Sequence, residues 1–362
     1  MTPPRRIYNF GAGPSILPVP VLEEASRGVL ELGTSGMSIL EVSHRGMDYE
    51  AIQFGARDRL LKIMGLSGDE YTVLFLGGGA SLQFAMLPMN FLKAGETADY
   101  IHTGEWSAKA MKEAKKFGEV HVAGNSESEK FTRIPQALTF SANAKYVHLT
   151  TNNTIEGTQF HQWPDVAGLP LIADASSDIL SRRIDFSKFA MIYAGAQKNL
   201  GPAGVTVVVI KKEFLAKANE NGPTLLRYRT HADADSLYNT PPVFAIYTLG
   251  LVLKWIEAEG GLSKIEERNR RKAQLIYQAL DAYPSFYDPT VSVKEDRSLM
   301  NITFRLRDVS LESEFLKGAG KLGMDGLKGH RSVGGFRASV YNAFPEAGAQ
   351  ALAEYLHRFA LR

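Results

Sequence analysis

The sequence predicts an α/β protein with a large, mostly parallel β-sheet and a smaller α+β domain at its C-terminus. Short runs of consecutive apolar residues alternate with helical periods over about the first 210 residues. Such runs are typical of strands covered on both faces, which indicates a parallel sheet between layers of helices. Beyond residue 259 the pattern changes to an alternating strand, a helix, a second strand and a closing helix.

Six short apolar runs predict the strands of the large sheet. They are residues 71–76, 98–102, 146–149, 170–173, 190–193 and 205–210. Helical periods at residues 21–32, 49–64 and 81–91 precede or separate these strands. Helices alternating with strands in this way predict a layered α/β domain.

The C-terminal part begins with a long helix. Pro241-Pro242 is a favourable helix start, and Gly260-Gly261 ends the helix. We expect further helices at 262–282, at 311–322 and from Pro345 onward, a half-exposed strand at 299–306 and another strand at 336–341. We therefore predict a large domain of residues 17–258, a small domain of residues 259–362, and an N-terminal segment, residues 1–16, associated with the small domain.

Composition and charge exclude several classes of function. The chain has 41 basic and 39 acidic residues, which gives no reason to expect a nucleic acid or a membrane as partner. It has no cysteine, which excludes disulfides, thiolate metal sites and cysteine nucleophiles. Its eight histidines show no metal-ligand spacing, so we expect no metal site. The N-terminus lacks the apolar core of a secretory signal, and we expect a cytoplasmic protein.

Two predicted strands are followed by residues that suggest chemistry. Asp174 directly follows one of them, and Lys198 follows another within a glycine-rich turn. Alone, such an aspartate more often caps a helix, and such a lysine is usually solvated. Together they can meet at the carboxyl edge of a parallel sheet. Pyridoxal 5′-phosphate (PLP) requires this pair, because a lysine amine bonds to its aldehyde and a carboxylate keeps its ring nitrogen protonated.

A glycine-rich turn after the first strand predicts an anion site. Gly77-Gly78-Gly79-Ala80-Ser81 leads directly into a helix, whose N-terminus favours a phosphate. The alternative is an ordinary tight turn. The spacing matches neither a nucleotide P-loop nor the dinucleotide fingerprint, which argues against a nucleotide cofactor.

These motifs, in this order, resemble the phosphoserine aminotransferase family, class V members of the fold-type I PLP enzymes, over essentially the whole chain. The segments that carry the resemblance are Asn9-Phe10-Gly11-Ala12-Gly13-Pro14, Glu41-Val42-Ser43-His44-Arg45-Gly46, Gly77-Gly78-Gly79-Ala80, Asp174-Ala175-Ser176-Ser177, Ala196-Gln197-Lys198-Asn199, Tyr238-Asn239-Thr240-Pro241-Pro242 and Gly329-His330-Arg331 with Arg337. The resemblance implies a homodimer with active sites at the subunit interface.

The resemblance also implies roles for individual residues around the cofactor. Lys198 and Asp174 are the catalytic pair, Trp106 stacks on the PLP ring, and Thr154 contacts its phenolic oxygen. The residues implied to hold the cofactor phosphate are Ala80, Ser81 and Gln197, with Asn239 and Thr240 from the second subunit.

Five cationic side chains are implied to bind the substrate. Arg337 holds the α-carboxylate, and guanidinium groups suit carboxylates and phosphates because they bind them bidentately. His330 and Arg331 of one subunit, with His44 and Arg45 of the other, hold the distal phosphate or the γ-carboxylate of glutamate. An isolated arginine is usually a solvated surface charge, but a cationic cluster in a nearly neutral chain requires a reason.

The implied reaction is transamination between phosphoserine and 2-oxoglutarate, in serine synthesis and also in vitamin B6 synthesis. The alternative is another class V aminotransferase of the serine– or alanine–glyoxylate type, which needs no second anion site. Two positions depart from the family pattern. Ser81 stands where some members have arginine, and Gly11-Ala12 stands where hydroxyl residues are common.

Overall fold

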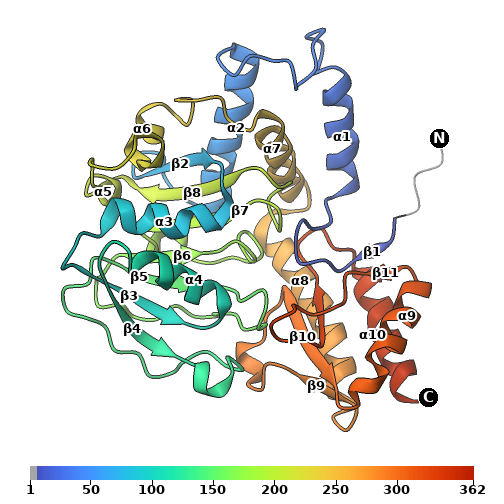
Figure 1. Ribbon diagram of the computed structural model, residues 1–362. Helices are drawn as coiled ribbons and strands as arrows, with labels where there is room; N and C mark the ends of the chain where they lie inside the picture. Colours follow the sequence, from blue (N-terminus) through green and yellow to red (C-terminus); the bar gives the residue numbers. More distant parts are fainter. Residues whose placement is uncertain (1–5) are drawn as a thin grey trace.

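The computed structural model describes residues 6–362, so residues 1–5 of the predicted N-terminal segment lie outside the described part. Figure 1 shows a large sheet, with helices around it, beside a smaller group of C-terminal elements coloured orange and red. The main sheet has seven strands in the order β2-β8-β7-β6-β5-β3-β4. The strands are β2 Tyr71–Leu76, β3 Thr97–His102, β4 Glu119–Asn125, β5 Val147–Thr150, β6 Leu171–Asp174, β7 Met191–Gly195 and β8 Thr206–Lys211.

Six of these strands confirm the predicted runs, and β4 was missed. β4 lies at the edge of the sheet, where only β3 pairs with it, and much of it is exposed. A strand in this position needs no continuous apolar run, because one edge and part of its surface face solvent.

The sheet is mostly parallel, as predicted, but β8 runs against its neighbours. It pairs antiparallel with both β2 and β7, whereas the pairings among β7, β6, β5, β3 and β4 are parallel. Five of the six β8 residues are buried. An apolar run therefore indicated burial on both faces, but it carried no information on strand direction.

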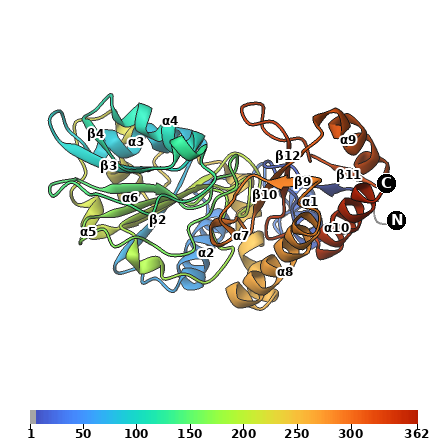
Figure 2. The same ribbon diagram turned by 90° about the horizontal axis from the view of Figure 1, so that it is seen from below.

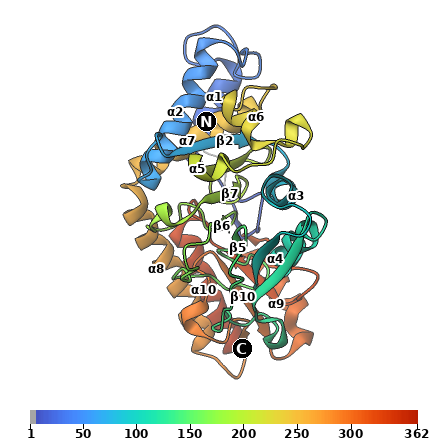
Figure 3. The same ribbon diagram turned by 90° about the vertical axis from the view of Figure 1, so that its left-hand side faces the viewer.

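Helices cover both faces of this sheet, and Figure 3 shows the three layers nearly edge-on. The covering helices are α1 Val19–Leu30, α2 Met47–Met64, α3 Gly79–Phe91, α4 Glu105–Ala114, α5 Lys212–Leu215, α6 Tyr228–Asp233 and α7 Val243–Ala258. One buried cluster joins alternate strand residues such as Val73 and Val207 to α1, α2 and α7. The other joins their neighbours, such as Leu74 and Val208, to α3 and α4.

The C-terminal elements form their own core, visible as a separate lobe in Figure 2. They are α8 Gly261–Asp281, β9 Tyr287–Pro289, β10 Asn301–Leu306, α9 Glu312–Lys321, β11 Met324–Asp325, β12 Phe336–Ser339 and α10 Glu346–Ala360. Strands β12, β10 and β9 make an antiparallel sheet in that order. The short N-terminal strand β1, Tyr8–Asn9, pairs with β11. The domain limits given above remain predictions.

The expectation that β10 is half exposed was wrong. Five of its six residues are buried, and only Arg305 is exposed. One face packs in the C-terminal core, while Asn301 and Thr303 hydrogen-bond to residues 152 and 156 of the large part. Polar residues alternate along β10 because the second face meets a polar segment, not because it meets solvent.

Among residues 6–362, no helix is both long enough and apolar enough to span a membrane.

Candidate active site

The segments that carry the predicted site residues leave the sheet at one edge. Asp174 ends β6, and its register partners are Thr150 at the end of β5 and Tyr193 in β7. Thr206, the first residue of β8, pairs with Gly195 at the end of β7 and with Leu76 at the end of β2. The turns that follow β2, β5, β6 and β7 therefore emerge together, because their parent strands end in register.

Lys198 lies in the turn between β7 and β8, with its amine on the site. Its Nζ donates a hydrogen bond to Thr154 Oγ1 at 2.6 Å and lies 5.8 Å from the centre of the Trp106 ring. Burial lowers the pKa of Lys198 to about 8, although the charge of Asp174 acts in the opposite direction. Such an amine is half neutral near pH 8, which suits a nucleophile and proton carrier.

Asp174 is 4% exposed, and its carboxylate is held by the residue two positions on. The backbone N–H and the hydroxyl of Ser176 both donate to Asp174 Oδ1, at 3.0 and 2.6 Å. Burial raises the pKa of Asp174, while the Ser176 hydrogen bonds and the charge of Lys198 lower it. Asp174 and Lys198 thus each shift the pKa of the other toward its charged form, against the effect of burial.

Arg337 enters the site from β12 of the C-terminal part. Its Nη1 donates to the backbone oxygen of Thr154 at 3.2 Å, so Thr154 contacts both Lys198 and Arg337. Arg337 Nε and Trp106 Nε1 are buried, and neither has a hydrogen-bond partner among residues 6–362. The site therefore presents unsatisfied donors to whatever binds there.

The glycine-rich turn places the start of α3 at the same edge. Gly78 and Gly79 both adopt positive φ angles, 82° and 64°, which residues with side chains rarely adopt. A Cβ added at Gly79 would meet no atom within 4 Å, so this helix start faces open space. Ala80 and Ser81 belong to the first turn of α3, whose amides have no partners within the helix. The Gln197 side chain folds back to Gly195, where an added Cβ would lie 2.6 Å from Gln197 Oε1.

The remaining predicted residues lie on exposed segments. His44 and Arg45 lie between α1 and α2, Asn239 and Thr240 lie before α7, and Arg331 lies before β12. Of these, only His44 is partly buried. His330 is also partly buried, and its pKa is lowered by burial and by the charges of Arg337 and Arg331. The charges of Arg331 and Arg337 thus both act on His330, whereas no hydrogen bond among residues 6–362 joins the side chain of His44 or Arg45 to these three residues.

Sequence reasoning missed two side chains. Ser15 donates through its hydroxyl to the backbone oxygen of Lys198 at 2.5 Å, which ties the N-terminal segment to the lysine turn. Glu156, two residues after Thr154, is 4% exposed and is the sole charged residue between positions 150 and 158. A lone carboxylate in an otherwise uncharged stretch was the available signal.

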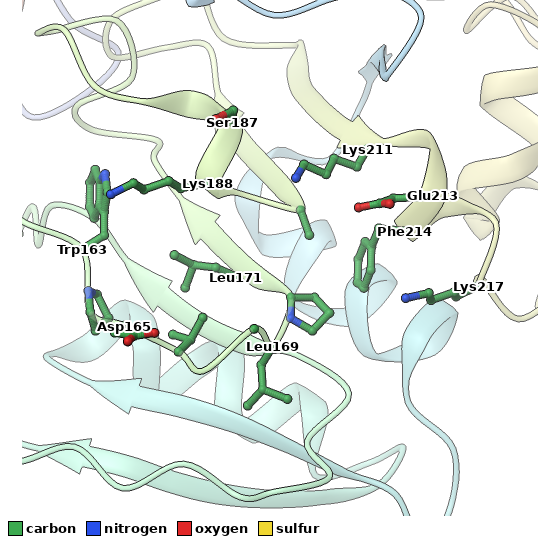
Figure 4. Close-up of a pocket in the computed structure, with 15 residues that line it drawn as sticks. Trp163, Asp165, Leu169, Leu171, Ser187, Lys188, Lys211, Glu213, Phe214 and Lys217 are labelled. Atoms are coloured by element: carbon green, nitrogen blue, oxygen red, sulfur yellow. The ribbon is translucent and has the colours of Figure 1, made fainter.

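A cavity of about 530 Å³ lies at the opposite edge of the sheet (Figure 4). Its walls include Leu171 at the start of β6 and Lys211 at the end of β8, together with Trp163 and Phe214. None of the predicted site residues lines it. Parallel sheets bind ligands at the carboxyl edge of their strands, so this cavity does not mark the candidate active site.

Comparisons with known proteins identify the family. The model of the family described as aminotransferase class-V matches residues 7–352. The phosphoserine aminotransferase of Niallia circulans is 52% identical over 357 residues, which is 98% of each chain. The corresponding protein of Desulfosudis oleivorans is 53% identical over 357 residues, again 98% of each chain. The chain belongs to the phosphoserine aminotransferase family.

Solved structures agree with this membership. A phosphoserine aminotransferase from Bacillus circulans subsp. alkalophilus has a TM-score of 0.96 at 52% identity, covering 98% of this chain and 99% of that one. A PLP-bound phosphoserine aminotransferase from Trichomonas vaginalis has a TM-score of 0.91 at 38% identity, with 97% and 99% covered. An alanine–glyoxylate aminotransferase from Nostoc sp. has a TM-score of 0.74 at 15% identity, with 99% and 96% covered, and shares the fold.

Members of this family are PLP-dependent enzymes, and PLP is the cofactor of this chain. Three features of the site fit it. The start of α3 faces open space where a phosphate can approach, Lys198 offers an amine with a lowered pKa, and Asp174 offers a buried carboxylate. The unpartnered Trp106 and Arg337 nitrogens lie beside them.

Proposed function

We propose that this chain exchanges an amino group between phosphoserine and 2-oxoglutarate, forming 3-phosphohydroxypyruvate and glutamate in one direction and the reverse in the other. The observation that carries the proposal is the convergence of Lys198, Asp174 and Arg337 around Thr154 and Trp106. The chain is 52–53% identical, over 98% of its length, to proteins named phosphoserine aminotransferase, and this similarity supports the choice of substrate.

The protein's own groups hold the reactants and move protons. PLP, when bound, supplies an aldehyde that takes up the amino group and a ring that accepts electrons from the Cα–H bond. Lys198 Nζ removes the proton from the substrate Cα and later returns one, as general base and then general acid. The buried carboxylate of Asp174 would hold the ring nitrogen of PLP in its protonated form, Thr154 orients the Lys198 amine, and Trp106 provides a flat apolar wall.

The substrates carry two anionic groups, one attached to Cα and one farther away, so recognition requires cations in two places. We assign the α-carboxylate to Arg337, since its guanidinium is anchored on Thr154 and has an unpartnered Nε. We assign the distal phosphate, or the γ-carboxylate of glutamate, to His330 and Arg331. These two residues share the Arg337 environment. The backbone amides at the start of α3, with Gln197, are assigned to the cofactor phosphate.

We further propose that the active enzyme is a homodimer. The segments that carry His44, Arg45, Asn239 and Thr240 are suited to complete the site of a second copy, since no hydrogen bond within the described residues joins these side chains to Lys198, Asp174 or Thr154. A cytoplasmic location, and a role in vitamin B6 synthesis besides serine synthesis, belong to the same proposal.

The alternative function is transamination of alanine or serine with glyoxylate, for which the fold is also suited. Such substrates have no distal anion, so they would leave His330 and Arg331 without a ligand.

The deciding experiment is an assay of the purified, PLP-loaded protein with 3-phosphohydroxypyruvate and glutamate, run beside glyoxylate with alanine or serine. We expect turnover of the phosphorylated pair to exceed that of the glyoxylate pairs by at least about tenfold, because one charge-assisted contact contributes ~1.5–3 kcal/mol. Equal or greater turnover of glyoxylate would reject phosphoserine as the substrate.

A further inference from the structure

The loop that carries Thr154 also carries a buried carboxylate that the proposed mechanism does not use. Glu156 Oε1 accepts a hydrogen bond from the backbone N–H of Glu105 at 2.8 Å. Its other oxygen, Oε2, is buried and has no hydrogen-bond partner among residues 6–362. A carboxylate left half-satisfied at 4% exposure is costly, so a compensating role is expected.

Glu156 adds a hydrogen-bond acceptor at the start of helix α4, where the Ser107 hydroxyl already accepts from the Gly104 amide. Helix α4 begins at Glu105, and its N-cap residue, Gly104, has no side chain to accept from the first-turn amides. Glu156 supplies that acceptor from 51 residues away, and its negative charge suits the positive end of the helix. The fit is close, since a Cβ added at Gly104 would lie 2.4 Å from Glu156 Cδ.

The helix end held by Glu156 is the one that carries Trp106. Trp106 is the second residue of α4, and its ring lies 5.8 Å from Lys198 Nζ. Movement of this first turn would therefore shift the Trp106 ring relative to the reacting amine.

Glu156 also acts on Arg337. The two side chains carry opposite charges and influence each other electrostatically, and Arg337 Nε, like Glu156 Oε2, is buried without a partner. Backbone contacts fix the position of Glu156 relative to Arg337. The backbone oxygen of Glu156 accepts a hydrogen bond from Thr303 Oγ1 on β10, and β10 pairs with β12, which carries Arg337.

We propose that Glu156 is a positioning residue whose carboxylate holds Trp106, through the start of α4, and Arg337 in the arrangement that the substrate requires. It does so in its ionised form, because only the charged group attracts both the helix end and the guanidinium. The charged groups that face it are Glu105 from α4 and Arg337 from β12, while β10 presents the uncharged Thr303.

Protonation of Glu156 should therefore weaken the site within the working pH range. Burial raises the pKa of the Glu156 carboxyl to about 7, although the Glu105 amide and the Arg337 charge lower it. Since the acid is charged only above this pKa, the positioned state should be lost as the pH falls through 7.

The test compares PLP-loaded wild type with Glu156→Gln, which keeps the shape and removes the charge. The reaction followed is amino transfer from glutamate, whose carboxylates do not titrate between about pH 6 and 8. We expect the KM for glutamate to rise about 10- to 100-fold in the variant at pH 8, the effect of a displacement of about 1 Å. We also expect the ratio of the variant's KM to that of wild type to fall toward 1 as the pH drops below 7, because Glu156 is then uncharged in wild type as well.

Two further variants keep the result interpretable. Gly104→Ala pushes the Glu156 carboxyl away from the opposite side, so its KM should rise in the same direction even if Glu156→Gln fails to fold. Glu113→Gln removes a 30% exposed carboxylate near the other end of α4 that pairs with Lys116, and it should behave as wild type.

An unchanged KM in both Glu156→Gln and Gly104→Ala, or a ratio of the KM of Glu156→Gln to that of wild type that stays constant from pH 8 to about pH 6, would overturn the proposal. The inference rests on the proposed function only through Arg337 as the carboxylate site, which glutamate and phosphoserine share. A wild type that uses glutamate but not 3-phosphohydroxypyruvate would sink the proposed function and leave this test intact.

Discussion

The two halves of the candidate site differ in how completely one chain builds them. Around Lys198, Asp174 and Thr154, the side chains are buried and joined by hydrogen bonds of 2.6 to 3.0 Å. The predicted anion-binding residues Arg45, Asn239, Thr240 and Arg331 are instead exposed, with no contact to that centre. One chain thus prepares the reacting centre, and the proposed homodimer would supply part of the substrate recognition from a second copy.

Burial shifts the pKa values of the charged residues in the buried half. Lys198, Asp174 and Glu156 all have pKa values shifted by burial toward their neutral forms. Charged cofactor and substrate groups can return these residues to their charged forms, because opposite charges favour ionisation. The cations of the exposed half undergo no such loss of solvation, since they remain in contact with water until a ligand binds.

Replacing Lys198 should break the buried half with the largest effect. In Lys198→Ala we expect turnover to fall by at least ~10³-fold, because both the nucleophile and the proton carrier are lost. The measurement is transamination of phosphoserine by the purified variant. Lys188→Ala, in the cavity at the opposite edge of the sheet, is the control and should retain wild-type turnover. Near-normal turnover of Lys198→Ala would show that the active site does not lie at the carboxyl edge of the sheet.

Neutralising Asp174 should have the next largest effect. Asp174→Asn keeps the Ser176 hydrogen-bond acceptor but removes the charge, so we expect kcat to fall by about 10²-fold or more while PLP still colours the protein. Single-turnover absorbance can separate cofactor binding from the proton-transfer step. Full activity would show that the buried charge is not needed for the reaction.

Replacing Arg331 examines the exposed half. In Arg331→Leu we expect the KM for phosphoserine to rise about 10- to 100-fold, because one charge-assisted contact of ~1.5–3 kcal/mol is lost. The dissociation constant of PLP should stay constant, since Arg331 is assigned to the substrate and not to the cofactor. A phosphoserine KM equal to that of wild type would show that Arg331 is an ordinary surface charge with no role in substrate binding.

The smallest expected effect comes from mixing two variants, Lys198→Ala and Arg45→Leu, and it tests whether the exposed half is shared between two chains. If Arg45 serves the site of the second copy, hybrids of Lys198→Ala and Arg45→Leu chains contain one intact site. We expect co-refolded mixtures to recover roughly a quarter of wild-type activity, the share of intact sites in a random mixture. Recovery should be absent when each variant is assayed alone. Mixtures as inactive as their components would argue that Arg45 acts within its own chain.

The sequence predicted the buried architecture well where burial was uniform. Apolar runs located six strands of the main sheet because strands covered on both faces admit few polar residues. The same rule could not find β4, whose edge is exposed, or give the direction of β8. It also misjudged β10, because a polar face can be buried against polar partners such as Asn152.

The order of motifs along the chain, by itself, determined the family and the residue types available for chemistry. The tertiary structure decided which of them meet: Thr154 between Lys198 and Arg337, and Glu156 at the start of α4. Those contacts span 44 to 183 residues of sequence. They depend on strand register and on the docking of the C-terminal part, neither of which leaves a local pattern in the sequence.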